Sequence, residues 1–124
     1  GGFRTSGNDE VLLARSQMGI ASRLTGVPVI DQIVADFSDS ERFMEEAYQA
    51  RALGFSGKLC IHPSQVPLAN KSFSYSEEEI TRAKEMLAVY DQAVSEGSAS
   101  VVYDGQMIDE ALAKQARRIL GLSD

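Results

Sequence analysis

Apolar residues along this chain alternate between the spacing of a helix and the short runs of a strand. Apolar positions three or four residues apart predict helices, and brief apolar runs bounded by turn residues predict strands. The predicted helices cover about residues 9–24, 39–53, 77–96 and 109–120, the predicted strands cover 29–34 and 58–61, and an extended segment over 100–105 ends in an Asp-Gly turn signal. The first half therefore has the order helix, strand, helix, strand, which indicates parallel strands joined by a helical crossover.

Two capping boxes mark the beginning of predicted helices. In each box a serine precedes a glutamate by three residues, Ser38 before Glu41 and Ser76 before Glu79. Such a pair satisfies backbone amides of the first helical turn that have no partner inside the helix. Residues 63–74, which separate the two halves of the chain, are expected to form a loop with one helical turn at most.

The strand over 58–61 ends abruptly in polar residues. Its apolar run is the pattern of a strand that is covered on both faces. His62, the only histidine in 124 residues, follows directly, and Pro63 prevents the strand ladder from continuing. Barrel and open-sheet enzymes place their chemistry at the carboxyl ends of buried parallel strands. His62 and Pro63 are therefore candidate site residues.

Composition limits the classes of function. The formal net charge of −6 and the lack of a basic stripe disfavour a nucleic-acid partner. No apolar run approaches the roughly 20 residues of a membrane helix, and no secretory signal pattern opens the chain. The single cysteine, Cys60, is expected to be an inert core thiol in a reducing compartment. We therefore expect a cytoplasmic protein with no membrane partner.

The predicted layout is too small to be a complete barrel. Two parallel strands with their helices make up only about a quarter of an eight-stranded barrel. Such a piece leaves strand edges unpaired and strand faces partly uncovered. Either the chain is a fragment of a larger fold, which we favour, or it completes its sheet with another chain.

The residues around His62 resemble a known family. Residues 57–66 strongly resemble the last barrel strand of citrate lyase beta-subunit-like enzymes of the HpcH/HpaI aldolase/citrate lyase family, which includes malyl-CoA and citramalyl-CoA lyases. Further segments resemble the same family in the same order: 13–16, 28–31, 73–79 and 105–109. The resemblance covers essentially the whole chain.

The resemblance implies an α/β fold, namely the C-terminal part of a (β/α)₈ TIM barrel. Residues 1–75 would supply its last two strands and their helices, and residues 76–124 the last barrel helix and a C-terminal lid or oligomerisation segment. The implied activity is magnesium-dependent cleavage of a C–C bond in a 3-hydroxyacyl-CoA, such as citryl-CoA, malyl-CoA or citramalyl-CoA. The products would be an acyl-CoA and a 2-oxo acid.

The metal site is not expected in this chain. In the family, magnesium is held by a glutamate and an aspartate at the ends of the fifth and sixth strands, and an arginine holds the substrate carboxylate. This sequence resembles the family only from the helix after the sixth strand onward, so these residues would lie upstream. We therefore assign no metal ligand here, and expect no independent activity from the chain.

Asp109 is the candidate catalytic residue. In the family, the aspartate of the Met-Ile-Asp motif transfers a proton at the acyl-CoA carbon from an adjacent subunit. The resemblance thus implies a homo-oligomer, a trimer or a hexamer, in which Asp109 acts in trans. A plainer interpretation is that Asp109 is the N-cap of the last helix, and the two interpretations are compatible.

The substrate-binding candidates are Asp31, His62 and Pro63. Asp31 lies within an apolar strand, so it needs a defined partner, and it either positions substrate or magnesium or makes a structural hydrogen bond. His62 either contacts substrate or holds its loop, and Pro63 is expected to shape the pantetheine channel. The cations of Arg4, Arg15 and Lys58 could attract the CoA phosphates, although surface salt bridges explain them as well.

Two other classes of function stay open. A CoA-thioester hydrolase on the same fold would let water attack the CoA carbonyl, although Ser64 has no second histidine for a serine-hydrolase triad. Alternatively, the segment is non-catalytic and serves as an oligomer-forming lid.

Overall fold

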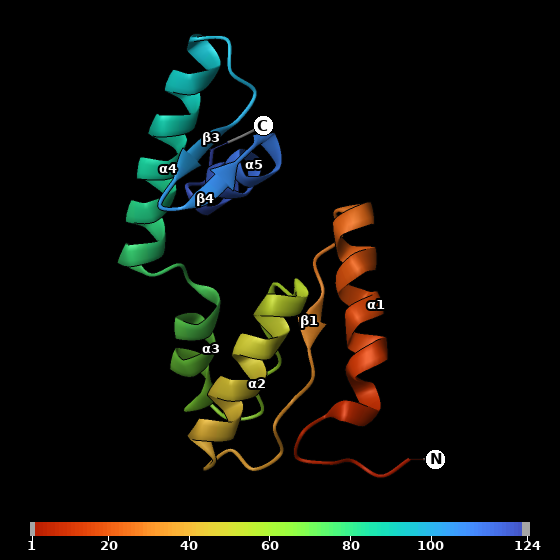
Figure 1. The fold of residues 1–124 in the computed structure, drawn as a ribbon. Coiled ribbons are helices and arrows are strands. Elements are labelled where there is room, and N and C mark those ends of the chain that lie inside the picture. Colours follow the sequence, from red (N-terminus) through yellow and green to blue (C-terminus); the bar gives the residue numbers. More distant parts are fainter. Residues whose placement is uncertain (1, 123–124) are drawn as a thin grey trace. The chain divides into compact units, whose positions relative to one another are not determined.

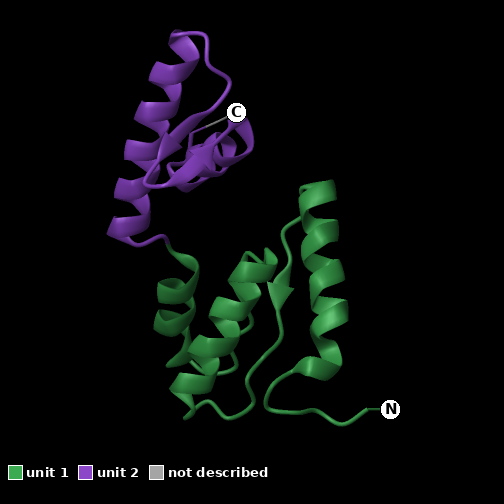
Figure 2. Ribbon diagram, viewed as in Figure 1, with its two compact units in different colours: residues 1–74 green, residues 75–124 purple. Residues whose placement is uncertain are grey.

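The computed structural model describes residues 2–122. They form two compact units, one up to Ser74 and the other from Tyr75 onward (Figure 2). Within the described residues, no helix combines the length and the hydrophobicity of a membrane-spanning segment.

The first unit combines helices with a short parallel strand pair, and Figure 1 draws it in the colours from red to green. Its elements are α1 (Asp9–Thr25), β1 (Ile30–Asp31), α2 (Ser40–Leu53), β2 (Gly57–Lys58) and α3 (Gln65–Phe73). The strands are parallel, with Ile30 opposite Gly57 and Asp31 opposite Lys58. The order helix, strand, helix, strand and the parallel pairing are confirmed. Each strand is shorter than predicted, because within residues 2–122 each has only the other to pair with.

Only one face of this strand pair is covered by the described residues. Val34, after β1, packs with Phe43 and Ala47 of α2, and Cys60 and α3 residues lie against this cluster. Leu59 and Ile61 keep more than half of their surface exposed. The prediction of a strand covered on both faces is therefore wrong for the described chain. The alternation of side chains along an extended segment places Cys60 toward the helices and its two neighbours on the opposite face.

The helices α1 and α2 approach closely at Gly19. A Cβ atom built on Gly19 would lie 1.9 Å from the carbonyl oxygen of Leu53. No side chain fits at that distance, so glycine is required where the backbones of the two helices meet.

The start of α2 differs from the sequence prediction. Asp39, not Ser38, caps α2, and its side chain accepts a hydrogen bond from Arg42 N at 3.0 Å. Ser38 instead donates its hydroxyl to Asp36 Oδ1 at 2.6 Å.

The predicted loop over 63–74 contains the helix α3. Pro67 lies in the first turn of α3, where its missing N–H has no intrahelical partner to lose. Leu68, Ala69 and Phe73 pack against the core around Phe43. Tertiary packing therefore stabilises a helix that the local sequence signals only weakly.

The second unit contains α4 (Glu77–Ser95), β3 (Val101–Tyr103), β4 (Gln106–Ile108) and α5 (Glu110–Ile119). The capping box of Ser76 and Glu79 is confirmed at the start of α4. The extended segment over 100–105 is the first strand of an antiparallel hairpin, in which Val102 is opposite Met107. Asp104 and Gly105 both have positive φ, as the tight turn between these strands requires. The core of the unit joins α4, the hairpin and α5 through Tyr90, Ile108 and Ala113.

Candidate functional site

The carboxyl ends of β1 and β2 lie side by side because the two strands are parallel. The chain after β1 carries Phe37, and the chain after β2 carries His62. Their rings stack, with centroids 4.5 Å apart and an interplanar angle of 18°. The sequence predicted a site at this edge of the strand pair. Phe37 also lies at this edge, although no sequence signal pointed to it.

Gln65 holds the two strand ends together. Its Oε1 accepts hydrogen bonds from Ile61 N at 2.8 Å and His62 N at 3.3 Å, and its Nε2 donates to the carbonyl of Val34 at 3.1 Å. Only 1% of Gln65 is exposed, so these bonds are shielded from water. Gln65 lies within residues 57–66, which resemble the family, but the sequence does not indicate the role of its side chain.

His62 and Pro63 are both exposed at this edge. The Nδ1 atom of His62 lies 2.8 Å from Ser64 Oγ, and the backbone N–H of Ser64 donates to the same nitrogen at 3.2 Å. The carbonyl of Pro63 accepts from Val66 N at 3.2 Å in the turn that leads into α3. His62 and Pro63 are neighbours in the sequence, and the fold leaves both of them exposed at the strand ends.

Asp31 lies away from this edge, on the face of the strand pair that the helices cover. Its two carboxylate oxygens accept hydrogen bonds from Arg15 Nε at 3.1 Å and Arg15 Nη2 at 3.0 Å. Lys58 Nζ donates to Asp31 Oδ2 at 2.8 Å. The defined partner that a buried carboxylate needs is therefore present. Because both oxygens are already bonded to cations, the geometry favours the structural alternative for Asp31.

Glu46 of α2 extends this buried group of charges. Lys58 Nζ lies 3.0 Å from Glu46 Oε2, and Arg42 Nε lies 2.9 Å from Glu46 Oε1. Burial alone raises the pKa of Glu46, but hydrogen bonds from Asn8, Arg42 and Lys58 outweigh it and leave the pKa below its ordinary value. Glu46 is therefore held as a carboxylate by the cations around it. We call the group formed by Arg15, Asp31, Glu46 and Lys58 the buried ion cluster.

The cations that could have attracted CoA phosphates are engaged within the chain. Arg15 and Lys58 are buried in the ion cluster, where both form salt bridges with Asp31. The salt-bridge alternative therefore accounts for these two cations, but the bridges are internal rather than on the surface. Arg4 is half-exposed and lies 3.5 Å from Glu10. Its guanidinium also donates to Asn8 Oδ1 at 2.9 Å.

Asp109 begins α5 in the second unit. Its Oδ1 accepts a hydrogen bond from Leu112 N at 3.1 Å, which is the N-cap geometry expected from the sequence. Asp109 is half-buried. Within residues 2–122, its other carboxylate oxygen makes no hydrogen bond or ion pair. The cap is therefore observed, and one oxygen stays available for a further role.

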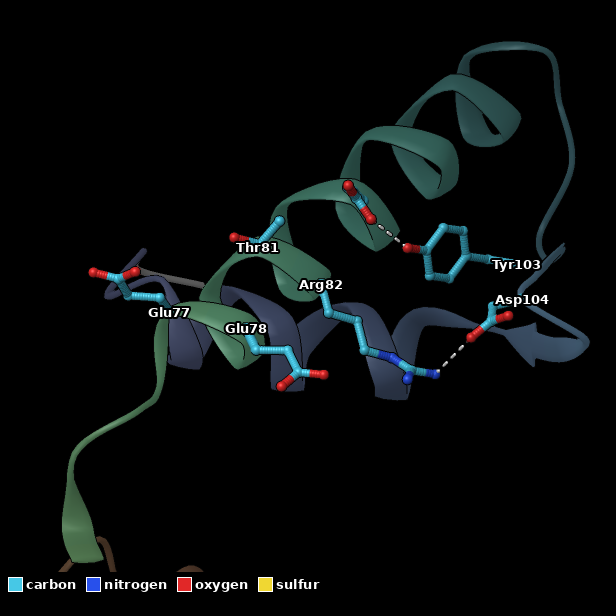
Figure 3. A pocket seen from close by; sticks show the side chains of 7 residues that line it. Glu77, Glu78, Thr81, Arg82, Tyr103 and Asp104 are labelled. Carbon is cyan, nitrogen blue, oxygen red and sulfur yellow. Dashed lines mark hydrogen bonds and ion pairs between the residues drawn. The ribbon is translucent and has the colours of Figure 1, made fainter. Parts of the chain in front are cut away.

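A hollow of about 390 Å³ lies between α4 and the hairpin turn (Figure 3). Arg82 pairs with Asp104 at 3.4 Å, and Tyr103 donates its hydroxyl to Glu85 at 2.6 Å. The bond to Glu85 raises the pKa of Tyr103. The side chains that line the hollow are mostly acidic: Glu77, Glu78, Thr81, Arg82, Glu85, Tyr103 and Asp104. Such a lining repels the phosphates of coenzyme A, so this hollow does not suit that ligand.

No magnesium site can be built from the described residues. Within residues 2–122, no three acidic, histidine or cysteine side chains are arranged to hold a metal ion. The deepest carboxylates, Asp31 and Glu46, already face Lys58 and arginines. A divalent cation would have to displace these partners, so the donor set here does not fit magnesium.

Parallel strands joined by a helix, with polar residues at their carboxyl ends, define an α/β domain of the kind that carries its site at that edge. The chain belongs to the HpcH/HpaI aldolase/citrate lyase family, whose defining sequence pattern matches residues 1–63. The family resemblance seen in the sequence is therefore confirmed.

The relatives are longer than this chain. A citrate lyase subunit beta-like protein of Deinococcus radiodurans is 47% identical over 120 residues, which are 97% of this chain and 42% of that protein. An L-malyl-CoA/beta-methylmalyl-CoA lyase of Cereibacter sphaeroides is 41% identical over 107 residues, 86% of this chain and 34% of that protein. This chain thus spans less than half the length of either relative.

A solved structure supports the fold assignment. The protein CitE of Mycobacterium tuberculosis, crystallised with magnesium, acetoacetate and coenzyme A, matches with a TM-score of 0.81 and 30% identity. The match covers 98% of this chain and 45% of that chain.

Proposed function

We propose that this chain is the C-terminal part of a barrel enzyme that cleaves coenzyme A esters. One observation carries the proposal: Gln65 joins the carboxyl ends of β1 and β2 in a chain whose fold matches a protein crystallised with coenzyme A. The strands β1 and β2 would be the last two of a (β/α)₈ barrel. The helix α4 would be its last helix, and the chain from β3 onward a C-terminal extension.

The proposed reaction breaks a C–C bond in a 3-hydroxyacyl-CoA. The 3-hydroxyl group loses its proton, and its carbon becomes the carbonyl carbon of a 2-oxo acid. The electron pair of the broken bond moves to the carbon next to the thioester. A proton delivered to that carbon gives the acyl-CoA product. Citryl-CoA, malyl-CoA and citramalyl-CoA are the proposed substrates, and the malyl-CoA lyase among the relatives supports this choice.

Asp109 is the proposed donor of that proton. A carboxyl group near the carbon can transfer a proton in the transition state. The oxygen of Asp109 that is not bonded to Leu112 N supports the assignment, because capping α5 does not occupy the whole group. Asp109 and the strand pair belong to different compact units. As the family resemblance implies, we propose that Asp109 acts on a neighbouring subunit of a trimer or hexamer.

The remaining proposed roles follow from the strand ends. His62 and Pro63 would border the channel for the pantetheine arm and the acyl group. Asp31 would act only indirectly, by fixing the strand pair. Magnesium would polarise the oxygens of the 2-oxo acid, and we place its ligands upstream of this chain because the described donor set does not fit it.

Product analysis of the full-length protein tests the proposal. With magnesium and each of the three CoA esters, we expect a 2-oxo acid and an acyl-CoA in equal amounts. Release of free CoA thiol without a 2-oxo acid would instead identify a thioester hydrolase. No turnover of any ester by an intact oligomer would favour the non-catalytic lid.

A further inference from the structure

One ring nitrogen of His62 is committed to its own loop. Both the backbone N–H and the hydroxyl of Ser64 lie within hydrogen-bond distance of Nδ1, at 3.2 and 2.8 Å. A backbone amide can only donate, so Nδ1 must offer its lone pair. The neutral imidazole then carries its proton on Nε2, an assignment that follows from the hydrogen-bond partners.

The plane of the same ring is fixed by Phe37. The two rings stack at 4.5 Å, and Phe37 remains half-exposed, so the pair stands at the surface of the strand ends. Stacking of this kind favours one orientation of the ring. The side chain of Gln65 also holds the backbone of His62, because its Oε1 accepts a hydrogen bond from His62 N. The orientation of the imidazole is therefore set both by backbone hydrogen bonds and by stacking on Phe37.

Within residues 2–122, Nε2 of His62 has no hydrogen-bond acceptor. A histidine that only braced its loop would be fully explained by its Nδ1 contact and its stacked face. The exposed Nε2–H is a remaining donor, held in a fixed direction. A nitrogen that carries a proton cannot bind a metal cation, so the complementary group is an oxygen acceptor.

We propose that Phe37 and Ser64 are positioning residues that present the Nε2–H of His62 to a carbonyl oxygen of the CoA ester. The inference rests on the proposed function, because the ester supplies the acceptor. Nε2 is the atom that binds, the backbone N–H of Ser64 keeps the proton on it, and the ring of Phe37 sets its direction.

A pair of substitutions separates substrate binding from loop bracing. In His62→Gln, the side-chain amide nitrogen can reach the position of Nε2 and still donate. In His62→Asn, the amide oxygen can replace Nδ1 as acceptor for Ser64, but nothing donates at the Nε2 position. We measure acetyl-CoA binding to the full-length protein by calorimetry. We expect His62→Gln to bind within about threefold of the wild type and His62→Asn to bind roughly tenfold more weakly, the loss of one hydrogen bond.

Nitrogen NMR reads the tautomer directly. With ¹⁵N-labelled histidine, and with His62→Asn to assign the signal, we expect an unprotonated Nδ1 and a protonated Nε2. Ser64→Ala keeps the backbone N–H that donates to Nδ1, so Nδ1 should stay unprotonated in this variant. Phe37→Leu should raise KM for the CoA ester with little change in kcat.

The outcomes distinguish this inference from the proposed function. If the wild-type protein binds acetyl-CoA and His62→Asn binds it equally well, the inference is overturned and the proposed function stands. A protonated Nδ1 in the wild-type protein overturns the inference as well. If the wild-type protein does not bind acetyl-CoA at all, both fall.

Discussion

Lys58 Nζ lies 2.8 Å from Asp31 Oδ2, and the two residues are register partners across the parallel pair of β1 and β2. Both side chains are almost completely buried. The strand pair is therefore held by an ion pair in addition to its backbone hydrogen bonds. Arg15 of α1 and Glu46 of α2 extend the interaction to both neighbouring helices.

Removing the cation of Lys58 should destabilise the fold strongly. Lys58→Met leaves Asp31 and Glu46 buried with one cation fewer, and breaking a buried pair in this way costs about 3–5 kcal/mol. Arg82→Met is the matched control, because it breaks the exposed pair with Asp104, and we expect it to cost less than about 1 kcal/mol. Urea unfolding of both variants measures the difference, and equal losses would contradict a stabilising role for the buried ion cluster.

Gly19→Ala should destabilise although it adds a better helix former. In an exposed helix this change stabilises by about 1 kcal/mol. Here the new Cβ would lie 1.9 Å from Leu53 O and force α1 away from α2. We expect a net loss of about 1–3 kcal/mol, as for other overpacked contacts. Gly7→Ala is the control, because its Cβ meets only ordinary contacts. A more stable Gly19→Ala protein in thermal unfolding would show that the helices can separate at no cost.

The two roles of Asp109 can be separated by its replacement. Serine is as good an N-cap as aspartate but has no carboxyl group. Asp109→Ser should therefore keep the stability of the fold while lowering kcat for 2-oxo acid release by about 10²–10⁴-fold, the usual contribution of a proton-transfer group. Asp109→Ala should lose about 1 kcal/mol of stability as well. Full turnover by the serine variant in the assembled oligomer would leave Asp109 with the capping role alone.

The stability contributed by Glu46 should disappear in acid. Its pKa in the folded protein lies below the ordinary value of 4.5, so its ion pairs stabilise the fold above pH 4.5. That contribution is lost as the pH falls below 4.5 and passes through the lowered pKa. Glu46→Gln should therefore be less stable than the wild type at pH 7, and the difference should shrink progressively below pH 4.5.

The control for Glu46 is its neighbour Glu45, which is exposed on the same helix. Glu45→Gln should change the unfolding free energy little at either pH. A difference between wild type and Glu46→Gln that stays constant from pH 7 to pH 3 would refute the electrostatic account.

The sequence predicted the elements whose signals are local. The apolar stripes of α1, α2, α4 and α5 follow the helical period, and the box of Ser76 and Glu79 involves residues only three positions apart. The helix α3 and the strand β4 were not predicted. The first depends on packing against Phe43, and the second on pairing with β3, so neither is specified by its own few residues.

At the site, the sequence by itself determined the family, through the segment around His62 and the other matching segments, and the need of Asp31 for a partner. These conclusions rest on residue types and their order along the chain. Only the tertiary structure decided that Arg15 and Lys58 are the partners of Asp31. It also decided that Gln65 joins the two strand ends by hydrogen bonds and that Phe37 stacks on His62. Arg15 precedes Asp31 by 16 residues and Phe37 precedes His62 by 25. The first contact forms where α1 folds back against β1, and the second where the crossover helix α2 brings the two parallel strands side by side. No periodicity within one segment encodes either of them.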